Sequence, residues 1–303
     1  MSLISVDELA ARLDDPDVRI ADVRWYLNRP GAGRAAYDAG HIPGAMCVDL
    51  DADLSAPDGY GAPGRHPLPT PQAFRQRLEE LGVGSDDLVV AYDDSGGTVA
   101  ARLWWMLDNL GHRGGAAVLD GGIQAWVAAG HELTTEPAAA HTARLELADE
   151  WTGVMERREL ADRLGALTLL DARAPERYRG EVEPIDPVPG HIPTALSSPT
   201  ALNLDPSGRF LDAAVLRARF DALIAPDRPV VTYCGSGTNA CHNSLAMRIA
   251  GLSDPILFYP DGTSSNALVT LCNPYGRTID VRLRGLTGVP IVGTIQVSGG
   301  AGP

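Results

Sequence analysis

One cysteine in this sequence stands where a thiol would be reactive. Cys234 follows the apolar, β-branched run at 229–233 and precedes Gly235-Ser236-Gly237, after which a helical pattern begins. The N–H groups that a tight turn leaves free, together with the dipole of the following helix, place partial positive charge beside such a thiol. A free cysteine is otherwise usually a small buried side chain. The flanking glycines favour a nucleophile here.

Strands and helices alternate around this unit. In the first part of the chain, the hydrophobic pattern predicts strands at 18–23, 42–50, 88–92 and 116–119, and helices at 5–13, 70–82, 98–110 and 122–129. Two of the helices begin with capping signals, Ser5 followed by Glu8 and Thr70 followed by a proline. Strands that alternate with helices predict an α/β fold, with a parallel sheet and helices on both of its faces.

The two halves of the chain share three landmarks in the same order, which indicates a duplicated domain. Asp22-Val-Arg24 recurs as Asp171-Ala-Arg173, Gly40-His-Ile-Pro recurs as Gly190-His-Ile-Pro, and Val89-Val-Ala-Tyr-Asp93 recurs as Val230-Val-Thr-Tyr-Cys234. A polar segment rich in Pro and Ala, at 134–141, separates the copies. We therefore expect an N-terminal domain at 1–136, a linker at 137–151, a C-terminal domain at 152–262 and a divergent tail at 263–303.

Composition narrows the possible partners. The chain has 303 residues, enough for two domains, and a net charge of −14. This excess of negative charge argues against nucleic acid or an anionic membrane surface as a partner. Four cysteines without paired C-x-x-C spacing predict neither a disulfide framework nor a zinc site, and we expect no metal and no cofactor.

The sequence also bears on location. Residues 1–5 have neither the basic nor the apolar stretch of a signal peptide. No run approaches the roughly 18 apolar residues that a membrane span needs. We therefore expect a cytoplasmic protein.

Together these motifs resemble the tandem rhodanese-family sulfurtransferases, which are the thiosulfate and 3-mercaptopyruvate sulfurtransferases. The resemblance rests on the duplicated landmarks, on Leu119-Asp-Gly-Gly-Ile-Gln-Ala-Trp126 and on the Cys234-Gly-Ser-Gly loop, and it covers about residues 1–262. It implies two rhodanese-like domains, each a mainly parallel five-stranded sheet flanked by helices, with the active site between them. Cys234 would then take sulfur from a small-molecule donor as a persulfide and pass it to cyanide, a thiol or thioredoxin.

The nucleophile belongs to the second copy alone. The residue that matches Cys234 in the first copy is Asp93, which has no sulfur, so we expect the N-terminal domain to be catalytically silent and to form a wall of the site. In the second copy, backbone N–H groups from 235 to 240 are expected to stabilise the anionic sulfur. The residues of this segment that we expect to contact the substrate are Gly235, Gly237, Thr238 and Asn239.

The loop also indicates the donor. Family members that use thiosulfate tend to carry basic residues after the cysteine, whereas those that use 3-mercaptopyruvate tend to carry Cys-Gly-Ser-Gly. Ser236 therefore favours 3-mercaptopyruvate and is expected to assist proton transfer near the sulfur, the alternative being a small loop residue without a role. Thr238-Asn239 departs from the Val-Thr that is usual in this loop, which can change the preferred donor.

Two residues of the N-terminal domain match an Asp–His pair of the mercaptopyruvate enzymes. Asp51, in Val48-Asp-Leu-Asp51, and His66, in Arg65-His-Pro-Leu68, would relay a proton to the substrate together with Ser236. In the alternative, His66 is an exposed loop residue and Asp51 a turn former.

Arg177 matches the family's arginine that holds the substrate carboxylate. The alternative is a surface arginine in a polar segment. Mercaptopyruvate enzymes usually carry a second arginine in a Pro-Glu-Pro-Arg segment, and the corresponding residues 182–189 contain none. A clamp of one arginine would bind a small keto acid less tightly.

Two other functions stay open as alternatives. One branch of rhodanese-like folds consists of Cys-dependent phosphatases, which need an arginine six residues after the cysteine, and position 240 is Ala. A non-catalytic sulfur carrier or regulatory protein is compatible with the missing arginine and with a tail that lacks the family's usual Trp-x-x-Trp segment. In that tail, apolar alternation at 281–297 predicts either one or two edge strands or a segment with little fixed structure.

Overall fold

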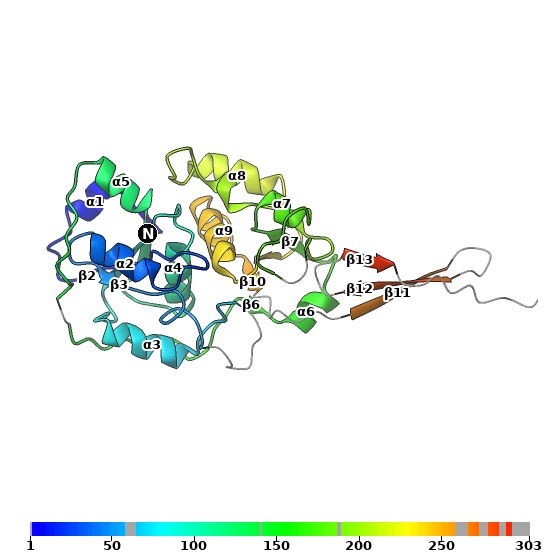
Figure 1. Ribbon diagram of the computed structural model, residues 1–303, viewed down its shortest axis with the longest axis horizontal. Coiled ribbons are helices and arrows are strands. Elements are labelled where there is room, and N and C mark those ends of the chain that lie inside the picture. Colours follow the sequence, from blue (N-terminus) through cyan, green and yellow to red (C-terminus); the bar gives the residue numbers. More distant parts are fainter. Residues whose placement is uncertain are drawn as a thin grey trace, which may run out of the picture.

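The structure is a computed structural model that describes residues 2–57, 65–139, 141–186 and 189–258. Beyond residue 258 it describes the backbone of three strands, at 266–272, 278–284 and 289–292. Two five-stranded parallel sheets, each with helices around it, form the two halves of the protein (Figure 1). This confirms the predicted α/β class and the two five-stranded sheets.

The first sheet has the strand order β1-β5-β4-β2-β3, and all its pairs are parallel. Its strands are β1 (Leu3–Ile4), β2 (Val18–Asp22), β3 (Met46–Cys47), β4 (Leu88–Tyr92) and β5 (Ala116–Leu119). The helices of this half are α1 (Val6–Ala10), α2 (Ala32–Ala39), α3 (Pro71–Glu80), α4 (Ala100–Asn109) and α5 (Gly122–Ala128). Of these, β1 and α2 were not predicted, and β3 covers only two residues of the extended segment expected at 42–50.

Strand β4 shows why the apolar run at 88–92 could be recognised. Val89 and Ala91 pack in one hydrophobic cluster with α3 and α4, whereas Val90 and Tyr92 pack in another with α1 and α5. Successive side chains of a strand point to opposite faces of its sheet. A strand covered on both faces therefore has to be apolar at every position.

The second sheet repeats the first, with the order β6-β10-β9-β7-β8 and parallel pairing throughout. Its strands are β6 (Val154–Met155), β7 (Thr168–Asp171), β8 (Leu196–Ser197), β9 (Val230–Tyr233) and β10 (Ile256–Phe258). Its helices are α6 (Arg157–Asp162), α7 (Pro175–Tyr178), α8 (Ala213–Asp221) and α9 (Thr238–Ile249), with a 3₁₀ turn, η1, at Thr200–Asn203. The identical strand order gives the duplicated sequence landmarks a structural counterpart.

The duplicated landmarks form the same hydrogen-bond network in each half. The Asp22 carboxylate accepts hydrogen bonds from Arg24, at 2.6 Å, and from the Tyr92 hydroxyl, at 2.7 Å. That hydroxyl accepts the N–H of Ile42 at 3.1 Å and so anchors the Gly-His-Ile-Pro segment. The corresponding residues of the second half are Asp171, Arg173, Tyr233 and Ile192. Because the aspartate and the tyrosine of each network are buried, replacing either one alone leaves a buried polar atom of its partner unpaired.

The two halves share one hydrophobic core across their interface. Helix α4 packs against α9 near the centre of the molecule (Figure 1). The cluster that contains α4 continues into the second half through Cys234, Cys241 and Leu245. The cysteine turn therefore lies where the two domains meet.

The segment predicted as a linker lies along the first domain. The Trp151 indole donates to the carbonyl of Pro69 at 2.8 Å, and the N–H of Leu145 donates to Glu79 at 2.8 Å. Where the two domains begin and end stays a prediction. Every helix among the described residues is too short or too polar to cross a lipid bilayer.

The tail forms a sheet of its own. Strands β11 (Asn266–Cys272), β12 (Thr278–Arg284) and β13 (Val289–Val292) pair antiparallel in that order. In Figure 1 they extend away from the second domain, beyond α6. The alternation at 281–297 indicated one or two edge strands, and β12 and β13 lie there. β12 pairs with both β11 and β13, and β13 is an edge strand of this separate sheet. Positions 285–288 and 293–297 lie outside the described residues.

One position of the repeat is strained. Thr194 has a φ of 71°, in the left-handed region, where the first copy has Gly44 with a φ of 77°. A side chain with a Cβ costs about 1–2 kcal/mol in this conformation. We expect Thr194→Gly to raise the free energy of unfolding by about 1 kcal/mol, after the greater entropy of glycine in the unfolded chain is subtracted. Thermal unfolding measures this, with Gly44→Thr as the reverse variant expected to lower the melting temperature. A lower melting temperature for Thr194→Gly would contradict the strain.

Candidate active site

Cys234 lies at the C-terminal end of β9 and is only 4% exposed. The N–H of Ser236 points at its Sγ at 3.4 Å, and the twelve-residue helix α9 begins at Thr238. Gly237, the N-cap of this helix, has a φ of 79°, which favours glycine. The turn therefore directs an N–H at the sulfur and places it at the positive end of a helix, an arrangement that stabilises a thiolate.

The matching turn in the first domain is filled by its own side chain. The Asp93 carboxylate is fully buried and accepts four backbone N–H groups within its turn, at 2.7–3.0 Å. The donors are Ser95, Gly97, Val99 and Ala100. Burial raises the pKa of Asp93, and the four hydrogen bonds oppose this. The anion-binding groups of this turn are thus occupied internally, which supports the expectation that the first domain is catalytically silent.

The predicted Asp–His pair is formed. His66 Nε2 lies 2.8 Å from Asp51 Oδ1, and the Trp25 indole donates to the other carboxylate oxygen at 2.8 Å. The His66 side chain is only 13% exposed, so the alternative of an exposed loop histidine is wrong. Burial, and then the positive charge of Arg102, lower the pKa of His66. The lowered pKa favours the neutral imidazole, which can accept a proton.

The third member of the predicted relay is not joined to this pair. Ser236 Oγ lies 3.2 Å from Thr238 Oγ1, and among the described residues it has no hydrogen bond to His66. His66 Nδ1 is buried and has no hydrogen-bond partner within the described part of the chain. That nitrogen is therefore free to bond to a substrate.

Arg102 was missed in the sequence. It lies on α4, is fully buried, and donates to the carbonyls of Leu54, His66 and Ser236 at 2.7, 2.8 and 3.0 Å. One guanidinium thus joins two loops of the first domain to the cysteine turn of the second. The available signal was an arginine in the first turn of an otherwise apolar helix segment, where a buried charge has to be paired internally.

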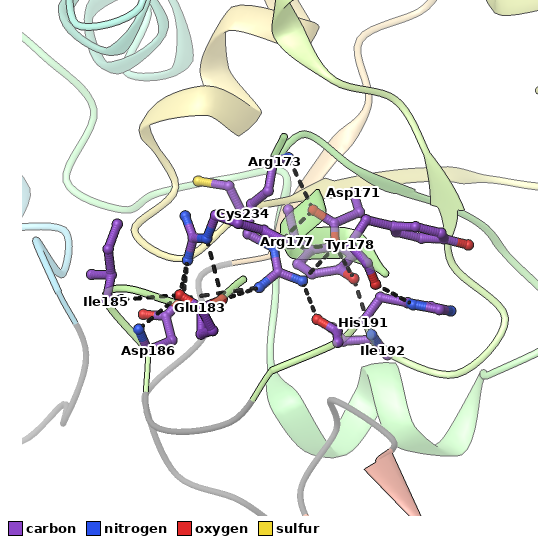
Figure 2. Close-up of polar contacts among 12 residues, drawn as sticks. Asp171, Arg173, Arg177, Tyr178, Glu183, Ile185, Asp186, His191, Ile192 and Cys234 are labelled. Atoms are coloured by element: carbon purple, nitrogen blue, oxygen red, sulfur yellow. Dashed lines mark hydrogen bonds and ion pairs between the residues drawn. The ribbon is translucent and has the colours of Figure 1, made fainter. Parts of the chain in front are cut away.

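Arg177 also lies inside the structure, because its side chain is only 15% exposed. Its Nη2 is 2.8 Å from Glu183 and 2.7 Å from Asp186 (Figure 2). The alternative of a surface arginine is therefore wrong. Where a second arginine was expected, residues 182–189 supply two carboxylates.

A second arginine, from the first domain, contacts the Asp186 carboxylate that Arg177 binds. Arg65 Nη2 lies 3.2 Å from Asp186, and the pair covers Gly235. A Cβ on Gly235 would come within 2.3 Å of Arg65 Nη2 and 2.7 Å of Asp186 Oδ2. Glycine directly after Cys234 thus lets charged side chains of both domains approach the backbone, and a Cβ there would push their ends aside. In the sequence, Arg65 appeared only as a neighbour of His66.

The rhodanese-like domain model matches residues 5–129 and 156–265. This chain belongs to the rhodanese family. The two matched regions contain Asp93 and Cys234, each in its turn, so the family assignment covers both copies.

Related proteins of the family carry sulfurtransferase names. A probable 3-mercaptopyruvate sulfurtransferase of Pseudomonas aeruginosa is 46% identical over 261 residues, covering 84% of this chain and 92% of that protein. A putative thiosulfate sulfurtransferase, SseB, of Mycobacterium tuberculosis is 39% identical, covering 82% of this chain and 88% of that protein. The solved 3-mercaptopyruvate sulfurtransferase from Leishmania major superposes with a TM-score of 0.75 at 29% identity, covering 86% of this chain and 72% of that one.

The remaining loop candidates of this rhodanese-family site hold the backbone in place. Thr238 is 5% exposed and bonds to Ser236, and the Asn239 amide donates to the carbonyl of Ala172 at 3.4 Å. Their side chains thus act on the shape of the turn. Among the described residues, His, Cys, Asp and Glu side chains form no group of three that could hold a metal ion.

Arg102→Met tests whether this arginine holds the site together. The change keeps a long side chain but leaves three buried carbonyls without their donor. We expect it to lower the free energy of unfolding by about 2–4 kcal/mol, measured by chemical denaturation. Arg113→Met is the control, since Arg113 pairs with Asp86 on the exposed surface and its loss should cost at most about 0.5 kcal/mol. Equal effects of the two changes would contradict the role of Arg102.

Proposed function

We propose that this rhodanese-family protein is a sulfurtransferase that takes sulfur from 3-mercaptopyruvate at Cys234 and passes it to a thiol or cyanide. The observation that carries the proposal is the Cys234 turn, with an N–H directed at Sγ, a helix N-terminus behind it and two arginines beside it. The sulfurtransferase names of the relatives support the reaction class, and the structural likeness to a mercaptopyruvate enzyme supports the donor.

The first half-reaction forms a persulfide. The Cys234 thiolate attacks the sulfur of 3-mercaptopyruvate, and an S–S bond forms while the C–S bond breaks. The electron pair of the C–S bond leaves with carbon as the enolate of pyruvate, which takes up one proton. The sulfur stays on Cys234, where the N–H groups of the turn stabilise its negative charge as they stabilised the thiolate.

The donor's S–H supplies the proton for the enolate, and His66 is assigned to carry it. With Nε2–H held by Asp51, the neutral ring accepts this proton at Nδ1 and delivers it to carbon, so the persulfide is left as an anion. The buried Nδ1 of His66 is the open nitrogen, and Asp51 at 2.8 Å orients the ring through Nε2. Ser236 belongs to the same proposal as a hydroxyl close to the sulfur, and it has to turn away from Thr238 to take part. Asp51, with a side chain that is 55% exposed, gives the pair contact with solvent protons.

The second half-reaction returns the thiolate. An acceptor thiolate or cyanide attacks the outer sulfur, the S–S bond breaks, and its electron pair returns to Cys234. Both halves use the same turn, so we expect ping-pong kinetics. Thioredoxin is included among the proposed thiol acceptors, and the cytoplasm is the proposed location.

The other functions are less well supported. A phosphatase needs an arginine where this chain has Ala240, which is fully buried in the core that the domains share. A sulfur carrier would form the same persulfide but would not turn over small donors rapidly. Turnover therefore separates this alternative from the enzyme.

Loading of Cys234 is the direct test of the proposal. Incubation with 3-mercaptopyruvate should add one sulfur atom to the intact protein, seen by mass spectrometry, and Cys234→Ser should abolish this gain. Cys47→Ser is the matched control, because burial raises the pKa of the Cys47 thiol to about 11 and keeps it protonated. If neither 3-mercaptopyruvate nor thiosulfate adds sulfur, the proposed reaction is wrong.

The donor and the role of His66 are tested together by steady-state turnover with cyanide. We expect kcat/KM to be at least about tenfold higher for 3-mercaptopyruvate than for thiosulfate. His66→Gln should lower kcat for 3-mercaptopyruvate by about 10²–10⁴-fold. It should affect thiosulfate much less, because sulfite leaves without needing a proton. A preference of the wild-type protein for thiosulfate, or equal losses for both donors, would contradict these assignments.

A further inference from the structure

We propose that Arg65 and Arg177, one from each domain, form a two-arginine clamp for the donor's carboxylate, and that Asp186 occupies this clamp in the free protein. The proposal deepens the function proposed above and rests on Cys234 as the nucleophile. It assigns Arg65 as a specificity-determining residue and Asp186 as an internal competitor of the substrate.

The Asp186 carboxylate bridges the two arginines. Its Oδ2 lies 2.7 Å from Arg177 Nη2, and its Oδ1 lies 3.2 Å from Arg65 Nη2. Each oxygen of one carboxylate thus faces a different guanidinium, which is how a pair of arginines holds a carboxylate ligand. The position of Asp186 therefore shows where a substrate carboxylate would lie.

This position is next to the reactive sulfur. A Cβ on Gly235 would come within 2.3 Å of Arg65 Nη2 and 2.7 Å of Asp186 Oδ2, and Gly235 directly follows Cys234. In Figure 2, Asp186 and Arg177 lie on the side of the site that carries Cys234. A ligand held there by its carboxylate would lie beside the residue that carries the sulfur, as binding of a short mercapto acid requires.

Asp186 can be displaced, whereas its neighbour Glu183 is held in place. Glu183 has a side chain that is 4% exposed, and it accepts N–H groups from Ile185 and Asp186 as well as contacts from Arg173 and Arg177. The side chains of Asp186 and Arg65 are 23% and 30% exposed. An ion pair that is partly solvated contributes little net stability, so an incoming carboxylate can replace it.

The balance of charge around Asp186 requires that a substrate carboxylate replaces the Asp186 carboxylate. Arg65 and Arg177 face Asp186 and Glu183, and these four groups cancel. Arg173 also lies 4.0 Å from Asp186 and 3.4 Å from Glu183, but its charge is balanced by the buried Asp171 at 2.7 Å. A substrate carboxylate that entered beside Asp186 would therefore meet no net positive charge, but one that replaces Asp186 takes over both guanidiniums. Removing the acidic side chain should accordingly favour anionic ligands.

In this clamp, Arg65 takes the role of the second arginine that residues 182–189 lack. The second guanidinium comes from the N-terminal domain instead of the C-terminal one. The first domain would then contribute a residue that recognises the donor, in addition to His66 and the wall of the site.

Alkylation of Cys234 tests the clamp without any sulfur transfer. Iodoacetate and iodoacetamide have similar size, and only the first carries a carboxylate. The rate of each is followed by intact mass, and their ratio reports how well a carboxylate is held beside Sγ. We expect Arg65→Gln to lower the iodoacetate-to-iodoacetamide ratio about tenfold and Asp186→Asn to raise it several-fold, consistent with one charge-assisted hydrogen bond.

Arg34→Gln is the matched control, since Arg34 pairs with Asp38 on the exposed face of α2 and should leave the ratio unchanged. Protection by pyruvate gives a second readout. Pyruvate should protect Cys234 of the wild-type protein from iodoacetamide, and the same protection of Arg65→Gln should require an about tenfold higher pyruvate concentration. Unfolding curves of Arg65→Gln and Asp186→Asn are used to check that both variants are folded.

The outcomes separate this inference from the proposed function. The clamp is wrong if the alkylation ratio is unchanged in Arg65→Gln or falls in Asp186→Asn. If Cys234 still gains sulfur from 3-mercaptopyruvate in that case, the proposed sulfurtransferase function is unaffected. If the ratio responds as expected but no donor loads Cys234, the carboxylate clamp is supported and the sulfur-transfer reaction is wrong.

Discussion

The site depends on one buried cation. Arg102 sits in the apolar interface between the domains and donates to carbonyls of the Leu54 turn, the His66 loop and the Cys234 turn. A guanidinium without partners in such surroundings would be strongly unfavourable, so these loops have to stay where their carbonyls reach it. The histidine and the cysteine come from different domains, and this one charge fixes them relative to each other.

Duplication explains how such a site arises from a repeated fold. Both copies build the same strand–turn–helix, and both turns present N–H groups that bind an anion. Asp93 fills the first turn with its own carboxylate, while in the second turn the Cys234 sulfur occupies this place. One residue type therefore decides which copy is reactive. The first domain, whose own turn is filled by Asp93, contributes to the site through the loop that carries His66 and Arg65.

The parts of this structure that follow local rules could be predicted from sequence. The buried strands at 88–92 and 230–233 and the capped helix after Thr70 depend on periodicity and capping, and the cysteine turn depends on its glycines. The sequence could not show the contacts of Arg102 with Ser236 and of Arg65 with Asp186, because each joins segments more than a hundred residues apart. Such pairs depend on how the domains pack.

The division of the site between domains has a further consequence for specificity. The nucleophile and the N–H group directed at its sulfur belong to the Cys234 turn, which the second domain builds from its own residues. Arg65, which would recognise a donor, and Asp186, which the donor would displace, meet across the interface and are more exposed than Cys234. Partly exposed side chains can change without disturbing a core, whereas the buried turn cannot. Differences in donor among proteins of this kind can therefore be encoded at the interface while the nucleophile and its turn stay the same.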